Sequence, residues 1–285
     1  MDIGIGAPIT IPGTSGATII EWARLADAGP FSSLSTLDRI VFPNYEPLIG
    51  LAASAAVTTR IRLMTSILIA PLRPAAVLAK QVASLDALSN GRVTLGLAVG
   101  GREEDYRAAP ADFHTRGRRF EEQLAVMKRI WSGERVADDI GPVGPPSVQA
   151  GGPPLLLGGS SPQALKRAAR WGDGYIGGGG TPEGSLKNYN IIFDHWKALG
   201  RPGKPRLVAT AYYFLGDDVL AEATAYRRAY YSRPGDPLEG VVRSAQEVRD
   251  RIKAYSDAGV DEKLFWPCSS NLNQVQRLAD VITGG

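Results

Sequence analysis

The stretch LLLGGSSPQALKRAARWGDGYIGGGG, residues 155–180, holds the pattern from which the fold can be inferred. An apolar run of strand length, residues 155–158, is followed by a helical pattern at 162–171 and by a second short apolar run at 174–176. Pro162 stands where the first turn of a helix tolerates proline, and Gly172 follows the helical pattern as a stop. A strand, a helix and a strand in this order predict a βαβ unit of a parallel sheet.

The same alternation extends over all 285 residues. Eight runs have strand length: residues 2–7, 33–36, 61–68, 93–99, 155–158, 174–176, 207–214 and 263–267. Nine segments have helical patterns: residues 18–28, 46–57, 74–88, 116–131, 162–171, 182–199, 219–231, 245–258 and 272–282. Eight βα units of roughly 36 residues each fit the usual size of a TIM barrel. The sequence therefore predicts an α/β protein, a single TIM (β/α)8 barrel over residues 1–285.

Two segments interrupt this alternation and are expected to be loop insertions within the one domain. Residues 138–154 contain Gly-Pro, Gly-Pro-Pro and Gly-Gly-Pro-Pro sequences, which cannot continue a helix. Residues 230–242 form a second polar segment with several Gly and Pro residues. The sequence leaves open whether the first insertion acts as a lid.

Composition argues against several classes of protein. The formal net charge is only +3, and Lys and Arg are interspersed with Asp and Glu, so no basic stripe indicates nucleic-acid binding. No stretch approaches the roughly 18 apolar residues of a membrane span, and no signal segment is recognised, which predicts a cytoplasmic protein without membrane contact. One cysteine and two widely separated histidines predict neither a disulfide nor a metal site.

The predicted barrel also indicates where the site lies, because active sites of TIM barrels form at the C-terminal ends of the strands. Candidates at the ends of the second, third and fourth strands are Asp38, Arg39, Thr65, Ser66, Ile67, Gly100 and Glu104. Asp38 and Arg39 could also pair with each other or with a neighbouring strand end. Trp266 and Cys268 end the last strand, where they could form a pocket wall or pack in the barrel.

The fifth and sixth strands both end in glycine-rich turns that open onto helices. The first turn contains Gly159, Ser160 and Ser161, and the second is the tetrad 177–180, which includes Gly177 and Gly178. Free backbone N–H groups, a helix N-terminus and two hydroxyls would meet there, which predicts a phosphate site. The alternative is that the glycines close tight turns and the serines only cap a helix.

Side chains for catalysis without a cofactor are scarce. The chain has no Gly-x-Ser-x-Gly elbow, no His-Glu-x-x-His and no Gly-x-x-x-x-Gly-Lys-Ser/Thr motif. A site of this kind indicates a bound cofactor. The alternative, a cofactor-free sugar-phosphate isomerase or lyase, needs a base or a Schiff-base lysine at a strand end, and Lys263 stands at the wrong end of its strand.

Three segments together resemble the bacterial luciferase-like family: LDALSNGRVTLG at 85–96, RGRRFEE at 116–122 and LGGSSP at 157–162. Weaker matches, among them Asp38-Arg39 and AGVDE at 258–262, extend the resemblance over nearly the whole chain. The resemblance implies a TIM barrel that binds FMN or the deazaflavin coenzyme F420. It departs from the common pattern at Gly101, where relatives often carry tryptophan, and at Ser35-Thr36-Leu37, where an aromatic often precedes the acid.

The resemblance also implies roles for individual residues. Ser66 and Ile67 fall where such proteins often have a cis peptide behind the flavin ring, and Asp38-Arg39 match the pair that flanks the ring in deazaflavin members. Expected phosphate contacts are Gly159, Ser160, Ser161, Gly177 and Gly178. Thr65 and Gly100 are further expected cofactor contacts.

Two versions of the chemistry follow from the resemblance. With FMN, a reductase partner supplies reduced flavin and the barrel shields the oxygenation of a small organic substrate from water. With F420, a hydride passes between the ring and the substrate while Asp38, Arg39 or Glu104 assists proton movement. The sequence does not separate FMN from F420. It also leaves open a non-catalytic flavin-binding protein of the same fold, and the resemblance implies a homodimer.

Overall fold

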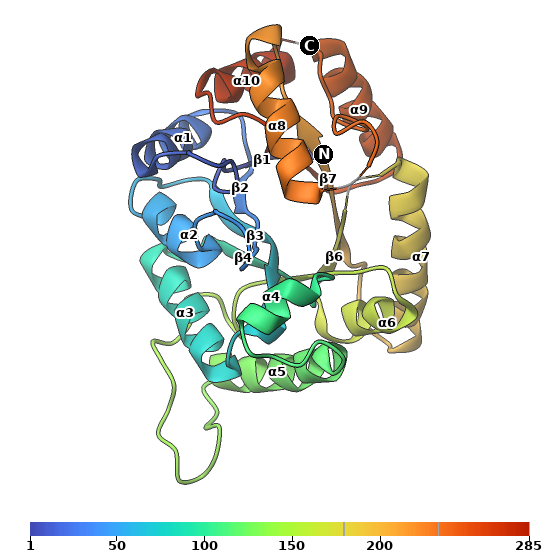
Figure 1. The fold of residues 1–285 in the computed structure, drawn as a ribbon. Helices are drawn as coiled ribbons and strands as arrows, with labels where there is room; N and C mark the ends of the chain where they lie inside the picture. Colours follow the sequence, from blue (N-terminus) through green and yellow to red (C-terminus); the bar gives the residue numbers. More distant parts are fainter. Residues whose placement is uncertain (179, 233, 285) are drawn as a thin grey trace.

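The computed structural model describes residues 1–178, 180–232 and 234–284. Eight parallel strands pair in chain order and close into a barrel, with β8 returning to β1 (Figure 1). The predicted α/β fold, a TIM barrel, is therefore confirmed. The strands are β1 (Asp2–Gly6), β2 (Ser33–Thr36), β3 (Arg62–Ile69), β4 (Val93–Ala98), β5 (Leu155–Gly158), β6 (Gly174–Gly177), β7 (Arg206–Tyr213) and β8 (Glu262–Pro267).

Helices surround the barrel, and each of the nine predicted helical patterns corresponds to one of them. The helices are α1 (Gly16–Ala28), α2 (Pro47–Ala55), α3 (Ala75–Leu88), α4 (Glu103–Ala108), α5 (Arg116–Trp131), α6 (Pro162–Trp171), α7 (Pro182–Ala198), α8 (Leu220–Tyr231), α9 (Ala245–Asp257) and α10 (Asn273–Thr283). Two 3₁₀ turns, η1 (Ala70–Leu72) and η2 (Asp217–Val219), complete the set. Helix α4 was not predicted from the sequence. It has only six residues, three of them acidic, and shows no apolar periodicity.

Local signals in the sequence explain where helices α6 and α7 begin. The Ser161 hydroxyl accepts a hydrogen bond from the Ala164 amide at 3.2 Å, and Pro162 occupies the first turn of α6. The Thr181 hydroxyl accepts from the Gly184 amide at 3.2 Å in the same way at α7. Both helices therefore start directly after a glycine-rich turn, with their N-termini facing the same end of the barrel.

An apolar layer crosses the barrel interior below its C-terminal end. Met64, Leu156, Ile176 and Val208 form one buried cluster, against which Ile67 packs. Each of them stands two positions before a residue that lines the cavity described below, and side chains two apart on a strand point to the same face. This cluster forms the floor of that cavity.

The predicted insertion at 138–154 is irregular and lies at the N-terminal end of the barrel. The buried Asp86 carboxylate, on α3, accepts hydrogen bonds from the backbone N–H groups of Val148 and Gln149 at 2.9 and 3.0 Å. The Gln149 side chain also donates to the carbonyl of Val93, the first residue of β4, at 2.8 Å. Figure 1 shows the segment between α5 and β5 extending away from the barrel beside α3 and α5.

The second insertion was predicted over 230–242, but its first two residues, Tyr230 and Tyr231, are the last turn of α8. The rest lies in the connection between β7 and α9, so it belongs to the opposite, C-terminal end of the strands. Residues 179 and 233, which fall within the predicted glycine tetrad and the second insertion, lie outside the described residues, as does residue 285. Among the helices of the described part, none has the length and apolar character that a membrane span requires.

Candidate functional site

A cavity of about 790 Å³ lies at the C-terminal ends of the strands. Its walls come from the ends of β3, β5, β6, β7 and β8 and from the first turns of α7. The lining residues are Leu37, Ser66, Ile67, Gly101, Gly158, Gly159, Ser160, Tyr175, Ile176, Gly177, Gly178, Gly180, Thr181, Gly184, Ser185, Asn188, Thr210, Tyr212, Tyr231 and Trp266. The volume is within the range of roughly 300 to 1,000 Å³ that is typical of small-molecule and cofactor sites.

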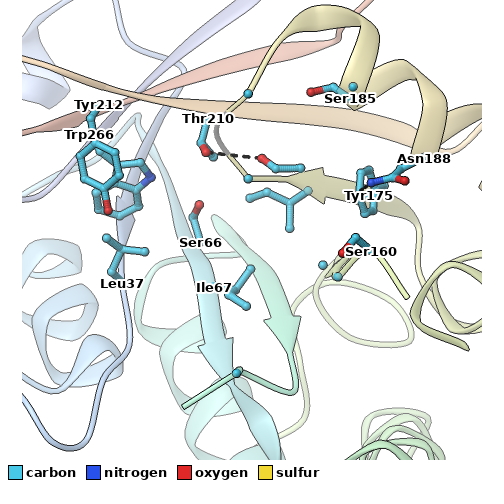
Figure 2. Close-up of a pocket in the computed structure, with 18 of the residues that line it drawn as sticks. Leu37, Ser66, Ile67, Ser160, Tyr175, Ser185, Asn188, Thr210, Tyr212 and Trp266 are labelled. Carbon is cyan, nitrogen blue, oxygen red and sulfur yellow. Dashed lines mark hydrogen bonds between the residues drawn. The ribbon is translucent and has the colours of Figure 1, made fainter. Parts of the chain in front are cut away.

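The two sides of the cavity differ in chemistry. Figure 2 shows Leu37, Tyr212 and Trp266 together on one side, with Ser66 and Ile67 near the middle. Ser160 and Tyr175 lie on the other side of the view. One end of the cavity is therefore aromatic and apolar, whereas the other is formed by polar side chains and glycine backbone.

The polar end is built by the turns after β5 and β6. Around Gly178, a side chain would have open space, because an added Cβ would meet no heavy atom within 4 Å. The neighbouring Tyr175 hydroxyl accepts a hydrogen bond from the Asn188 amide on α7 at 3.2 Å. Backbone N–H groups and two helix N-termini can thus be approached closely by a ligand, which is the arrangement that suits an anionic group.

Ser66 is the polar group near the centre of the cavity. Its hydroxyl is buried and has no hydrogen-bond partner among the described residues. The Ser66–Ile67 peptide bond is cis, as the resemblance implies. Thr65, one residue earlier, points away and donates to the Gly96 carbonyl at 2.7 Å. A buried hydroxyl without a partner costs free energy, so Ser66 is suited to bond a ligand placed here.

Asp38 does not line the cavity. Its buried carboxylate accepts a hydrogen bond from the Ile69 amide at 2.8 Å and forms an ion pair with Arg73 at 2.6 Å. Burial raises the pKa of the Asp38 carboxyl, against the opposing effect of the Arg73 guanidinium. Asp38 thus joins the end of β2 to the end of β3.

Arg39 and Glu104 likewise pair with other side chains and do not line the cavity. The Arg39 guanidinium forms ion pairs with Glu104 at 2.6 Å and with Asp105 at 3.4 Å, and its carbon lies 5.6 Å from the centre of the Tyr230 ring. Asp105 in turn accepts the backbone N–H groups of residues 40 and 41. A catalytic role for Asp38, Arg39 and Glu104 stays a prediction, and within the described structure they form a network beside the cavity.

The predicted cofactor contacts divide in a similar way. Those that line the cavity are Ser66, Ile67, Gly159, Ser160, Gly177 and Gly178. Thr65, Gly100 and Ser161 do not line it, and Ser161 instead caps α6. Trp266, considered as a wall residue, does line the cavity, whereas Cys268 is fully buried against other apolar residues.

Sequence reasoning missed several lining residues. They are Tyr175, Ser185, Asn188, Thr210, Tyr212 and Tyr231. Two signals could have found some of them: Ser185 and Asn188 are three positions apart on one helix face, and Thr210 and Tyr212 alternate on one strand face. Tyr231 carries no such signal, since it comes from α8, beyond the end of β7.

Comparison with known proteins gives matches over most of the chain. Residues 1–241 match the family model described as luciferase-like monooxygenase. An uncharacterised protein of Mycobacterium tuberculosis is 33% identical over 195 residues, which cover 58% of this chain and 66% of that protein, just under two thirds of its length.

Two relatives have described activities. The F420-dependent glucose-6-phosphate dehydrogenase of Beutenbergia cavernae is 38% identical over 180 residues, covering 55% of this chain and 51% of that protein. The oxygenase component of a flavin-dependent trigonelline monooxygenase of Acinetobacter baylyi is 24% identical over 297 residues, covering 87% of this chain and 82% of that protein.

Among solved structures, monooxygenase RslO1 from Streptomyces bottropensis superposes with a TM-score of 0.84 over 99% of this chain and 97% of that one. At 22% identity this likeness shows the shared fold alone. The family model, in contrast, spans most of the sequence. Since it matches residues 1–241 of 285, the chain belongs to the luciferase-like monooxygenase family.

Proposed function

We propose that the protein is an oxidoreductase that binds reduced FMN or coenzyme F420 in the cavity at the C-terminal ends of the strands and oxidises or reduces a small organic substrate. One observation carries the proposal: a single cavity combines the Ser66 hydroxyl, which has no partner among the described residues, and an aromatic wall with an open glycine-lined end beside two helix N-termini. A flat ring joined to a phosphate has this same division between an apolar and an anionic part.

The residues present fit such a group. We place the ring beside Ser66 and Ile67, where the free hydroxyl can bond a ring heteroatom, and the phosphate at Gly159, Ser160 and Gly178. Either cofactor would supply the redox chemistry, so the protein has to hold the ring, admit the substrate and exclude water. Thr65 and Ser161 would not contact the cofactor but hold the neighbouring backbone in place. The Thr65 hydroxyl donates to the Gly96 carbonyl, and the Ser161 hydroxyl accepts from the Ala164 amide.

Tyr212 is the side chain we propose for contact with the substrate. Its hydroxyl accepts the Tyr231 hydroxyl at 3.0 Å, which leaves its own hydrogen free to be donated into the cavity. Burial raises the pKa of Tyr212 well above its ordinary value, so the phenol stays protonated at neutral pH. It can therefore orient a substrate oxygen or nitrogen without itself becoming charged.

For Asp38, Arg39 and Glu104 we propose a positioning role. Their network holds the loop after β2 and helix α4 against the end of β3. It therefore fixes the backbone next to Ser66 and Leu37, which line the cavity. Proton transfer by these three groups would require them to reach the substrate, and each already has a partner within the protein.

The two relatives named above that have described activities use a flavin-type cofactor: one is flavin-dependent and the other F420-dependent. Their names support the class of cofactor we propose and do not choose between its members. If FMN is the cofactor, we propose a separate reductase as partner, because the relative from Acinetobacter baylyi is the oxygenase component of its enzyme. We also propose a homodimer, which light scattering behind a sizing column would test.

The cofactor-free alternative finds little support in the position of Lys263. Its amino group donates to the Thr210 carbonyl at 2.9 Å and lies 3.5 Å from the centre of the Tyr255 ring on α9. Lys263 is not among the residues that line the cavity. A Schiff base with a substrate in the cavity would need this side chain to leave its buried position.

The test is a calorimetric titration of the purified protein with FMN and with F420, each in oxidised and reduced form. Saturable binding of one of them at one site per chain supports the proposal and identifies the cofactor. If neither cofactor binds, the proposed function is wrong. Tight binding of an oxidised cofactor that is never reduced or reoxidised in the presence of any substrate would favour a non-catalytic flavin-binding protein.

A further inference from the structure

A second cavity of about 450 Å³ adjoins the first. The two share four lining residues, Gly180, Thr210, Tyr212 and Tyr231, so a ligand that fills the first cavity can extend past the tyrosines into the second. The outer part of the second cavity is formed by α8, α9 and the segment between them.

Among the residues that the structure describes, three arginines line this second cavity: Arg227 and Arg228 from α8, and Arg251 from α9. The Arg227 guanidinium stacks 4.1 Å from the centre of the Tyr212 ring and 4.3 Å from that of Tyr231, and its Nη1 is buried without a hydrogen-bond partner among the described residues. These contacts hold the guanidinium in place while leaving donor capacity unused.

Of the other two arginines, Arg251 also interacts with the Tyr255 hydroxyl on its own helix. Arg251 donates to the Gly180 carbonyl at 3.4 Å, and Arg228 is exposed on α8. Within the described part of the chain, no ion pair within 4.0 Å joins any of the three to a carboxylate.

Two acids, Asp236 and Glu239, also line the cavity. The Asp236 carboxylate already accepts the Leu238 amide at 2.9 Å. Among the described lining residues, three guanidinium groups face two carboxylates, an excess of one positive charge, and the Arg227 guanidinium has an unused donor. Guanidinium groups bind the planar oxygens of carboxylates and the oxygens of phosphates through paired hydrogen bonds.

We propose that the second cavity binds the anionic group, a carboxylate or a phosphate, of a substrate whose apolar ring lies against Tyr212 and Trp266 in the first cavity. The proposal rests on the proposed function and names its substrate class: an aromatic or apolar body that carries an oxyanion. The cofactor phosphate has its own site at Gly159 and Ser160, so the arginines are left for the substrate.

The experiment uses three probes of one shape: 2-naphthoate, 2-naphthyl phosphate and the uncharged 2-naphthamide. Each is titrated by calorimetry into the wild-type protein, with and without the bound cofactor, and into the variants R228Q and R251Q. The matched control is R249Q, because Arg249 is exposed on α9 and contacts Gln246 without lining the cavity. R228K retains the positive charge.

We expect at least one of the two anions to bind more tightly than the amide, and R228Q and R251Q each to weaken it about tenfold, while R249Q leaves it unchanged. R228K, which keeps the charge but cannot form the paired hydrogen bonds, should restore only part of the loss. Which of the two anions binds more tightly distinguishes a carboxylate from a phosphate substrate.

Equal affinity for the anions and the amide, or equal anion affinity in R228Q, R251Q and R249Q, would overturn the proposal. So would weaker cofactor binding in R228Q and R251Q with unchanged anion binding, since the arginines would then serve the cofactor. Failure of the proposed function is separate: it appears as absence of FMN and F420 binding in the wild-type protein, whatever the probes do.

Discussion

At the scale of single residues, Ser160 is the side chain that tests the proposed phosphate site. It lies in the turn after β5, is exposed and lines the cavity. Ser161, the next residue, caps α6 and would confuse the result because its loss weakens the helix. A substitution at Ser160 therefore reports on ligand binding.

Replacing Ser160 with Asp is expected to lower the affinity for FMN or F420 by about tenfold or more, because a carboxylate would face the cofactor phosphate. Ser160→Asn is the control, since asparagine has nearly the same shape without the charge. Calorimetric titration of both variants measures the difference. Equal affinities of the two variants would show that the phosphate binds elsewhere.

At the scale of elements, the loop after β2 and the end of β3 are joined by one buried ion pair. The Asp38 side chain is fully buried, and that of Arg73 is 13% exposed. Arg73 also contacts Glu46, the residue that caps α2, at 2.9 Å. The pair thus connects β2, β3 and α2 at the rim of the cavity.

Arg73→Met is expected to lower the free energy of unfolding by about 3 kcal/mol, because it leaves the Asp38 carboxylate buried without its counter-ion. The loss should shrink as the pH falls, since protonated Asp38 carries no charge to be compensated. Arg24→Met, which removes an exposed pair with Glu21, is the control and should change stability by less than about 1 kcal/mol. Urea denaturation at several pH values measures the free energy of unfolding of each variant. Equal losses in Arg73→Met and Arg24→Met would contradict the prediction.

Lys263 joins β7 and β8 to α9 and gives a second prediction at this scale. Burial, helped by the positive charge of Arg251, lowers the pKa of Lys263 from 10.5 to about 6. Between those two values the unfolded chain binds a proton that the folded chain does not. The free energy of unfolding of the wild-type protein should therefore rise with pH across this window, by up to about 1.4 kcal/mol per unit from this group.

Lys263→Met should remove that dependence. The free energy of unfolding of the variant should therefore increase relative to that of the wild type as the pH falls from about 10 toward 6. Lys166→Met, on the exposed face of α6, serves as the control and should keep the wild-type slope. The readout is the unfolding free energy from denaturant titrations at pH 6.5, 8 and 9.5. If the unfolding free energy depended on pH in the same way in all three proteins, Lys263 would not be neutral in the folded state.

At the scale of the whole molecule, the two predicted insertions belong to opposite ends of the barrel. The segment 138–154 connects a helix to the following strand, and in a βα barrel such connections lie at the N-terminal end. Asp86 and Gln149 fasten it there, and none of its residues lines either cavity described above. The part of the second insertion that the structure describes, in contrast, lines the arginine-rich cavity.

Removing residues 139–145 is therefore expected to leave the affinity for FMN or F420 within about twofold of wild type, because no cofactor contact is lost. Some stability should be lost along with the Lys80 hydrogen bond to the Gly144 carbonyl. Shortening the segment 234–240 provides the comparison, since it should alter probe binding in the second cavity. A large loss of cofactor affinity on removal of 139–145 would restore the idea of a lid.

Much of this architecture is determined by the sequence alone, because its signals are local or periodic. Apolar runs of strand length, helical patterns, proline at helix starts and glycine at their ends yield eight βα units, and eight such units leave little choice but a barrel. The same local rules place the Gly159-Ser160 and Gly177-Gly178 turns at the C-terminal end, where they line the cavity.

Only the tertiary structure decided what the charged and aromatic side chains do. Asp38, Arg39 and Glu104 stand at the correct end of the barrel, yet each has a partner within the protein. Asp38 and Arg39 are buried, and a buried charge is stable only when it is paired, here with a residue of another element. Arg228 and Arg251 meet around one cavity although 22 residues separate them in the sequence. Such meetings depend on how helices pack on the barrel, and sequence periodicity carries no information about that packing.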